Sequence, residues 1–534
     1  MKKLPAILFA VSVMVMLTSC ASSGGLSKKQ KKIKDVEYLN SLNQGDFDSC
    51  LKYMESLYPE NSKKKKNKNA NLQNKIRDDF DIGMLNHYMG DYEKSLQVMN
   101  STDSLMHQAF TKSITQGIAA ATINDNMAEY GGTPYEYMYL NIFNALNYYN
   151  LGDYDEAAVE IRKLNNKQKE FIVKYGSLLK NLSDSYSAEN SDERSKLENA
   201  YKTLNLNRNQ FAGQTPKKPT EEDIFRDSPL ARYISLLFYM MEGDDGNASL
   251  DARTLNVLNK SIDVSDDLKI PRGNGRLNVL AFSGFIGRRG EQRIRIGPFL
   301  GIYYHRKTRN GSEALVIPPF DLEFAYPVFP APQSYESQVF TVPASLFDPL
   351  IKLKPGNVQI IPNAVDSVTS VQLVMDDDCG DFSGKTYNFS LLEDLNYAVQ
   401  QDVNLKAKTA YTRSVIRSLI RKFTTVTGSS VALTSARIAL DENNGDIFQY
   451  LAYTAAYVAL AATVDALDSL ETADIRQAYV LPAKANACGI TLPEGNSSFT
   501  VKYFADQTLV HQQHFSNVSV KDGKPTIVES LCTK

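Results

Sequence analysis

The chain has 534 residues, and at about 150 residues per domain this length allows two to four domains. Its 59 basic and 61 acidic side chains leave a net charge of −2. This balance argues against a nucleic acid as the general partner, because nucleic-acid-binding domains carry a basic face.

The first twenty residues have the three parts of a bacterial export signal. Two lysines form a basic start, Leu4–Leu17 is almost entirely apolar, and the segment ends in Leu-Thr-Ser-Cys at Cys20. The apolar run is shorter than the ~20 residues that a membrane-spanning helix needs. The ending resembles the lipobox of bacterial lipoproteins, whose cysteine receives a diacylglyceryl group. The resemblance implies a signal peptide over residues 1–19 and a lipid-anchored Cys20 with a tether over residues 20–34. An ordinary cleaved signal is the alternative.

Four stretches of the N-terminal half share one pattern: an apolar helical segment, Gly-Asp, usually an aromatic residue, and a second helical segment. Glycine permits the left-handed conformation that ends a helix, and aspartate caps the next helix by accepting its free N–H groups. The aromatic residue is expected to wedge between the helices, and a small residue three positions later, such as Ala157, lets them approach. The four turns are Gly45-Asp46-Phe47, Gly90-Asp91-Tyr92, Gly152-Asp153-Tyr154 and Gly243-Asp244.

This pattern resembles the tetratricopeptide repeat, most closely in the third unit. The glycines lie 45, 62 and 91 residues apart instead of the ~34 of that repeat, so the units are degenerate and separated by insertions. The resemblance implies an all-α, tetratricopeptide-like helical solenoid over residues 35–268. A generic helical bundle with Gly-Asp turns is the alternative.

Two stretches, Tyr130–Asn165 and Glu471–Lys484 ("ETADIRQAYVLPAK"), are denser in distinctive residues than the rest. They resemble signature stretches of a poorly characterised family of bacterial lipid-anchored proteins with a tetratricopeptide-repeat-like N-terminal half. The resemblance implies architecture and anchoring, and no active-site residue can be carried over from it. The charged residues of the first stretch, expected in ion pairs between helices or on solvated faces, are Glu136, Glu156, Glu160 and Arg162.

Beyond a boundary rich in proline, glycine and charge, short apolar runs bounded by turn residues are typical of strands. We expect a mixed α/β domain with antiparallel strands over residues 269–534, which makes the whole chain α+β. Pro318–Pro332 carries five prolines and is expected to be a surface loop. Asn357–Pro362 is expected to be a strand, and the Lys-Asp-Gly turn within Asn517–Leu531 predicts a hairpin.

Two helical segments of this half are ambiguous. Within Leu391–Val426, Arg413, Arg417 and Arg421 recur every four residues, and we expect a solvated basic face, with contact to anionic lipid as the alternative. Ile447–Val464 has eighteen residues without a formal charge. We interpret it as a buried helix, and a membrane span is the alternative.

No pattern for a catalytic, cofactor-binding or metal site emerges. No G-x-S-x-G or H-E-x-x-H motif occurs. The Asp376–Asp381 cluster is expected to be a polar turn, and His511 and His514 face opposite ways if they lie in one strand. The cysteines other than Cys20 show no C-x-x-C spacing, so Cys488–Cys532 is a candidate disulfide and buried thiols are the alternative. These cysteines are Cys50, Cys379, Cys488 and Cys532.

The sequence therefore predicts a lipid-anchored cell-envelope protein, not an enzyme, that binds a protein or peptide partner on the concave surface of its solenoid. It would face the periplasm or the cell exterior. Ala21, in place of an aspartate after the anchor, favours the outer membrane where a cell has one. The alternatives are an envelope hydrolase with its active site in the C-terminal half and a structural lipoprotein that tethers envelope layers.

Overall fold

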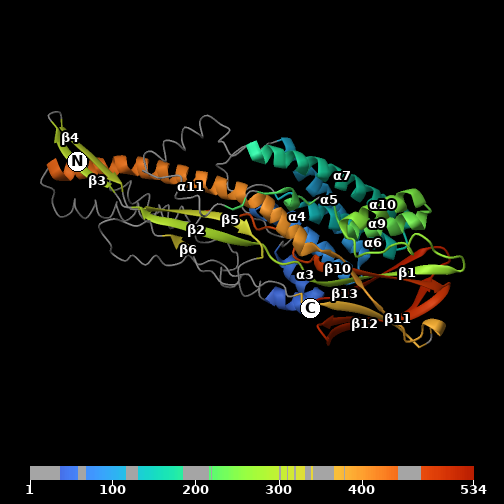
Figure 1. Ribbon diagram of the computed structural model, residues 1–534. Helices are drawn as coiled ribbons and strands as arrows, with labels where there is room; N and C mark the ends of the chain where they lie inside the picture. Colours follow the sequence, from blue (N-terminus) through green and yellow to red (C-terminus); the bar gives the residue numbers. More distant parts are fainter. Residues whose placement is uncertain are drawn as a thin grey trace.

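The computed structural model describes residues 37–57, 68–115, 130–184, 216–217, 219–225, 227–299, 302–308, 311–317, 320–330, 338–340, 366–377, 379–442 and 471–534. Cys20 with its signal and tether, the run Asn357–Pro362 and the segment Ile447–Val464 lie outside these residues. In the described part, helices fill the N-terminal half and largely antiparallel sheets fill the C-terminal half (Figure 1). The predicted α+β class is confirmed.

The helical half is built from antiparallel pairs of helices joined at the Gly-Asp turns. Residues 37–44 are helical and precede α3, while α4 packs on α5, α6 on α7, and α9 on α10. The central helix α6 is buried on all sides from its first residue to Asn147, as expected for a helix that is apolar around its circumference. The helices are α3 (Phe47–Ser56), α4 (Lys68–Tyr88), α5 (Tyr92–Thr115), α6 (Pro134–Asn150), α7 (Tyr154–Asp184), α9 (Pro229–Glu242) and α10 (Asp245–Leu258), with a 3-10 turn η3 (Glu221–Asp223).

Two four-stranded sheets form the body of the second half. The first has the order β13-β1-β10-β9, in which β1 runs antiparallel to β10 and parallel to β13. The second is antiparallel and has the order β12-β11-β7-β8. The strands are β1 (Asn274–Phe285), β7 (Ser370–Met375), β8 (Thr386–Asn388), β9 (Ser390–Asp394), β10 (Pro482–Pro493), β11 (Gly495–Ala505), β12 (Thr508–Val520) and β13 (Pro525–Cys532), with a 3-10 turn η4 (Gly380–Phe382).

The remaining strands accompany the long helix α11, as Figure 1 shows for β2 and β5. One small sheet has the order β5-β2-β6, and β3 pairs with β4 in a hairpin. None of the helices within the described ranges is both long enough and apolar enough to span a membrane. These elements are β2 (Gly290–Phe299), β3 (Ile302–Thr308), β4 (Gly311–Ile317), β5 (Phe320–Val328), β6 (Gln338–Phe340) and α11 (Leu395–Glu442).

Strand β1 lies in the middle of three layers and is buried on both faces. On one face, its Phe282 ring lies 5.6 Å from the Phe143 ring of α6. On the other face, Leu277 and Val279 belong to a second apolar cluster with residues of β7 and β11. One hydrophobic core thus runs from the helices into the first sheet, across the expected boundary between residues 268 and 269.

Two local predictions are wrong. The segment Pro318–Pro332, expected to be a loop, contains β5, whose Leu322 and Phe324 are fully buried. Proline is tolerated there because β5 is an edge strand, with Pro327 opposite Glu291 of β2. The expected C-terminal hairpin is a turn between two sheets, because β13 pairs with β1 and not with β12.

Candidate binding surface and the contacts that hold it

The four Gly-Asp turns share one backbone geometry. Their glycines have φ between 75° and 78°, the left-handed region that a side chain would disfavour. In each turn the glycine N–H donates to the carbonyl three residues back, and the aspartate N–H to the carbonyl five residues back. This is the Schellman pattern of helix ends, and it reverses the chain in the same way each time. The glycines are Gly45, Gly90, Gly152 and Gly243.

Each turn aspartate caps the following helix. Its carboxylate accepts a backbone N–H three residues ahead, over 3.0–3.3 Å. Hydrogen bonds to Ser49, Lys94 and Asn247 lower the pKa of the Asp46, Asp91 and Asp244 carboxyls respectively. The caps are Asp46, Asp91, Asp153 and Asp244.

In the first three turns an aromatic residue follows the aspartate and packs on a neighbouring aromatic ring. The Tyr154 ring lies 5.5 Å from Tyr149 at the end of the preceding helix, and Tyr92 lies 5.5 Å from His87. Phe47 instead contacts Tyr88 of the next hairpin, at 5.4 Å. The small residue between the helices is fully buried in every unit, as Cys50, Ser95, Ala157 and Ala248.

The stretch Glu471–Lys484 crosses the helices as an extended strap that leads into β10. Carboxylates of other elements bind its backbone N–H groups. Glu136 of α6 accepts from Ala478 at 2.6 Å, and Asp81 of α4 accepts from Tyr479 at 2.7 Å. Burial raises the pKa of Asp81 to about 7. The expectation that Glu136 lies in an ion pair or on a solvated face is therefore wrong.

Two of the three arginines on the basic face of α11 contact the strap, and the expected solvated face is therefore wrong in part. Arg417 is 2% exposed and lies 3.3 Å from Glu471 of the strap, while Arg421 lies 2.5 Å from the other oxygen of the same carboxylate. Arg413 is half-buried. Arg417 and Arg421 thus stabilise the docking of the strap through Glu471, where the sequence predicted contact with solvent or, as the alternative, with lipid.

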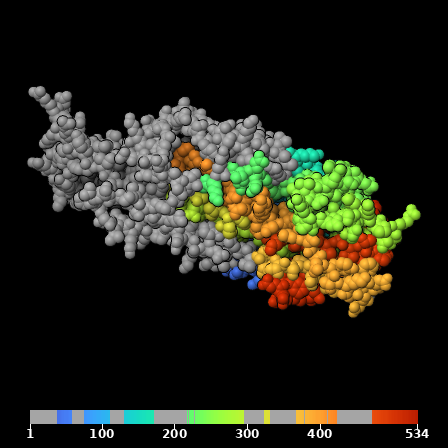
Figure 2. Space-filling model, viewed as in Figure 1, coloured from blue at the N-terminus to red at the C-terminus, as the bar shows by residue number. Residues whose placement is uncertain are grey.

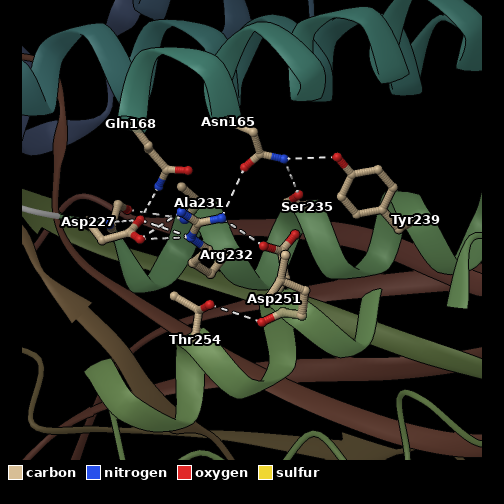
Figure 3. Close-up of polar contacts among 11 residues, drawn as sticks. Asn165, Gln168, Asp227, Ala231, Arg232, Ser235, Tyr239, Asp251 and Thr254 are labelled. Carbon is tan, nitrogen blue, oxygen red and sulfur yellow. Dashed lines mark hydrogen bonds and ion pairs between the residues drawn. The ribbon is translucent and has the colours of Figure 1, made fainter. Parts of the chain in front are cut away.

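The last helical hairpin, α9–α10, is held against α7 by a buried polar network around Arg232 of α9 (Figure 3). Its guanidinium binds Asp227 through two nitrogens, at 2.9 and 2.7 Å, and Asp251 of α10 at 2.8 Å. In Figure 3, Asn165 and Gln168 point from α7 toward this network, and the Asn165 oxygen accepts from Arg232 at 3.3 Å. Burial raises the pKa of Asp227 despite its bonds to Arg232.

Because Asp251 holds the inner face of α10, the outer face has a fixed position, and it carries apolar side chains beside the exposed Arg253 and the half-buried Thr254. Leu250 is 53% exposed, and Val257, seven residues later on the same face, is 78% exposed. Leu258, at the margin of the face, is 38% exposed. Figure 2 shows α9 and α10, in light green, at the surface of one end of the molecule. We call Leu250, Val257 and Leu258 the α10 outer face; exposed apolar groups of this kind mark interaction sites when they cluster.

The faces of α4, α6 and α9 that an open solenoid would offer to a partner are covered by the chain's own first sheet. His87 of α4 bonds Glu529 of β13 at 3.0 Å, and Tyr233 of α9 accepts from Asn278 of β1 at 2.9 Å. The concave binding surface expected from the sequence is thus filled. Among the described residues the most exposed large apolar side chain, Val257, lies on the second helix of the last hairpin, whereas others, such as Tyr397 at 61%, lie elsewhere.

Among the residues that the structure describes, the candidate metal and disulfide residues form no site. Asp376 bonds His514 at 2.7 Å in an exposed turn, and no cluster that would hold a metal ion occurs among the described residues. Cys488 and Cys532 are free, on the two strands that flank β1, opposite Val279 and Ser283. Because β1 lies between them, β10 and β13 are about 9.5 Å apart, which is too far for a disulfide.

Sequence reasoning missed Arg232, Asp251 and the α10 outer face, although the Gly243-Asp244 turn between α9 and α10 was identified. The apolar spacing of Leu250 and Val257 was visible, but both positions also fit a core-facing stripe.

Comparison of the chain with protein-family models, with curated proteins and with solved structures finds no match.

Proposed function

We propose that this chain is a lipid-anchored protein of the cell envelope that binds another protein through the α10 outer face. The proposed anchor is the thiol of Cys20, whose surroundings resemble a lipobox. A single acyl chain binds membranes only marginally, so the two or three chains of a lipoprotein are the expected anchor.

The observation that carries the binding proposal is the exposure of Val257 and Leu250 on a helix whose opposite face is held by the Arg232 network. A rigid helix loses little entropy on docking, so apolar side chains at fixed positions favour binding. The chain would act by binding and not by catalysis, with an envelope protein or an extended or helical peptide segment as partner.

The test is co-purification of the tagged full chain from detergent-solubilised envelopes. Val257→Asp places a charge in the proposed interface, and Asn256→Asp places the same charge one residue away, on the exposed flank of α10. We expect one protein to co-purify in stoichiometric amount with the wild type and with Asn256→Asp, and to be lost with Val257→Asp. Equal recovery with both variants, or no stoichiometric partner, would overturn the proposal.

A further inference from the structure

A cavity of about 520 Å³ lies between residues 216–217 and 220–223, strand β5 and helix α11. Atoms of these three segments adjoin at the surface in Figure 2, in green, yellow and orange. The cavity is separate from the α10 outer face, and none of the features described above uses it. Its lining residues are Pro216, Lys217, Thr220, Asp223, Tyr326, Pro327, Val328, Phe329, Gln400, Val403, Asn404 and Ala407.

The acidic group of the cavity, Asp223, already accepts three hydrogen bonds. One Asp223 oxygen accepts the N–H and the hydroxyl of Thr220, at 2.8 and 3.1 Å, and the other accepts the Asn404 amide at 2.8 Å. The Asn404 oxygen in turn accepts from the Gln400 amide nitrogen at 2.7 Å. A ligand would therefore find little bonding capacity left at Asp223 and Asn404.

Three polar groups of the lining have no such partner among the described residues. They are the Lys217 ammonium, which is exposed, the Tyr326 hydroxyl and the Gln400 side-chain oxygen. Burial raises the pKa of Tyr326, so its hydroxyl is a protonated donor at neutral pH. The cavity thus offers one cation, one hydroxyl donor and one amide acceptor.

The remaining walls are apolar. Val403 is 2% exposed and Ala407 is 8% exposed, and they line the α11 side. The rings of Tyr326 and Phe329 line the β5 side, where Tyr326 is fixed by an edge contact with Tyr411 at 5.7 Å between ring centres. Rigid aromatic walls with a few convergent polar groups are typical of small-ligand and peptide sites.

We propose that this cavity binds the C-terminus of a peptide that ends in an apolar residue. The terminal carboxylate pairs with the Lys217 ammonium, a backbone N–H donates to the Gln400 oxygen, and a backbone carbonyl accepts from the Tyr326 hydroxyl. The last side chain packs between the aromatic rings and the Val403–Ala407 side of α11. A fatty acid supplies the carboxylate and the apolar body but no N–H donor, so it satisfies only part of the lining.

The test is fluorescence anisotropy of the full chain with labelled hexapeptides that are degenerate at the inner positions and end in leucine. One pool carries a free carboxylate and the other a terminal amide, with dodecanoate as an unlabelled competitor. We expect the free carboxylate to bind about fivefold more tightly, the gain of one partly exposed ion pair. Lys217→Met should remove that gain and leave the amide pool unchanged, whereas Lys269→Met, at an exposed lysine outside the cavity, should change neither.

Tyr326→Phe removes only the hydroxyl and should weaken both pools by a similar factor, with an unchanged melting temperature as the check on folding. Equal binding of the two pools to the wild type, no effect of Lys217→Met, or displacement by dodecanoate at lower concentration than by unlabelled peptide would each overturn the proposal. The α10 outer face has its own test above, so either site can fail without the other.

Discussion

The Glu136 carboxylate accepts the backbone N–H of Ala478 at 2.6 Å, from a residue 342 positions further along the chain. The two stretches singled out in the sequence, Tyr130–Asn165 and Glu471–Lys484, meet at this bond. The other Glu136 oxygen accepts the Thr133 N–H at 2.7 Å and the Tyr130 hydroxyl at 2.6 Å, so one side chain both caps α6 and holds the strap. Glu136 is thus one of several buried groups, with Asp81 and His87, that join the helical layer to the strap and the first sheet.

Glu136→Gln should destabilise the chain strongly. The amide nitrogen would face N–H donors, and a buried hydrogen bond to a charged group contributes about 1.5–3 kcal/mol. We expect the free energy of unfolding in urea to fall by about 3 kcal/mol. Glu156→Gln, at an exposed position of α7, is the matched control and should change it by less than about 0.5 kcal/mol. Similar values for the two variants would show that Glu136 does not hold the strap.

His87 makes stability depend on pH. Its Nδ1 faces the Asn147 oxygen at 2.7 Å and its Nε2 faces Glu529 at 3.0 Å, while the Asn147 nitrogen is used by Ser95. Both ring nitrogens therefore donate. Burial opposes the charge, but Glu529 and these hydrogen bonds outweigh it, and the pKa of His87 is raised.

Because the pKa of His87 is higher in the folded chain than in the unfolded chain, protonated His87 stabilises the fold. This contribution is fully present below the unfolded-state pKa of ~6.5 and is lost as the pH rises through the folded-state pKa. The difference in unfolding free energy between the wild type and His87→Gln should therefore shrink from pH 5.5 to pH 9. The buried carboxyls of Asp81 and Glu393, whose pKa burial raises to about 7, are present in both proteins and cancel. This assignment would be contradicted if the difference stayed constant with pH, or if its pH dependence persisted when Glu529→Gln was present in both proteins.

Arg232→Met should be among the most damaging changes in the helical half. It leaves Asp227 and Asp251 buried without their cation, and breaking such a buried pair costs about 3–5 kcal/mol. Arg162→Met removes an exposed pair with Glu242, at 3.2 Å, and should cost less than about 1 kcal/mol. Urea unfolding of the two variants decides whether the network or the apolar packing of α9 and α10 fixes the last hairpin, since equal costs would favour packing.

Cys20→Ser tests the anchor. We expect the wild-type chain in the membrane fraction, with a mass raised by acyl chains and lacking residues 1–19. The variant should keep its signal or lose its lipid and should no longer sediment with membranes after alkaline extraction. An unchanged mass and unchanged sedimentation of the variant would rule out the thioether.

The helical hairpins were predictable because each is decided by local chemistry: a glycine that must adopt positive φ, an aspartate that caps, and a small residue at the contact. What sequence reasoning could not supply depends on distant partners. His87 has its partners 60 and 442 residues away, and Arg417 meets Glu471 across 54 residues.

The strand β5 was missed for a different reason. Five prolines in Pro318–Pro332 outweighed the alternation of Leu322, Glu323 and Phe324, although an edge position makes proline harmless. The coverage of the inner helices by the first sheet was likewise invisible, because an apolar helix face looks the same whether its neighbour is a partner or the chain's own sheet.

The most direct test of the central proposal is photo-crosslinking in living cells with a benzophenone amino acid at position 257 or at position 256. Contact through the α10 outer face predicts one discrete crosslinked species from position 257, several times stronger than from position 256, and lost when Leu250→Asp is added. Crosslinks of equal strength from both positions, or none from position 257, would contradict it.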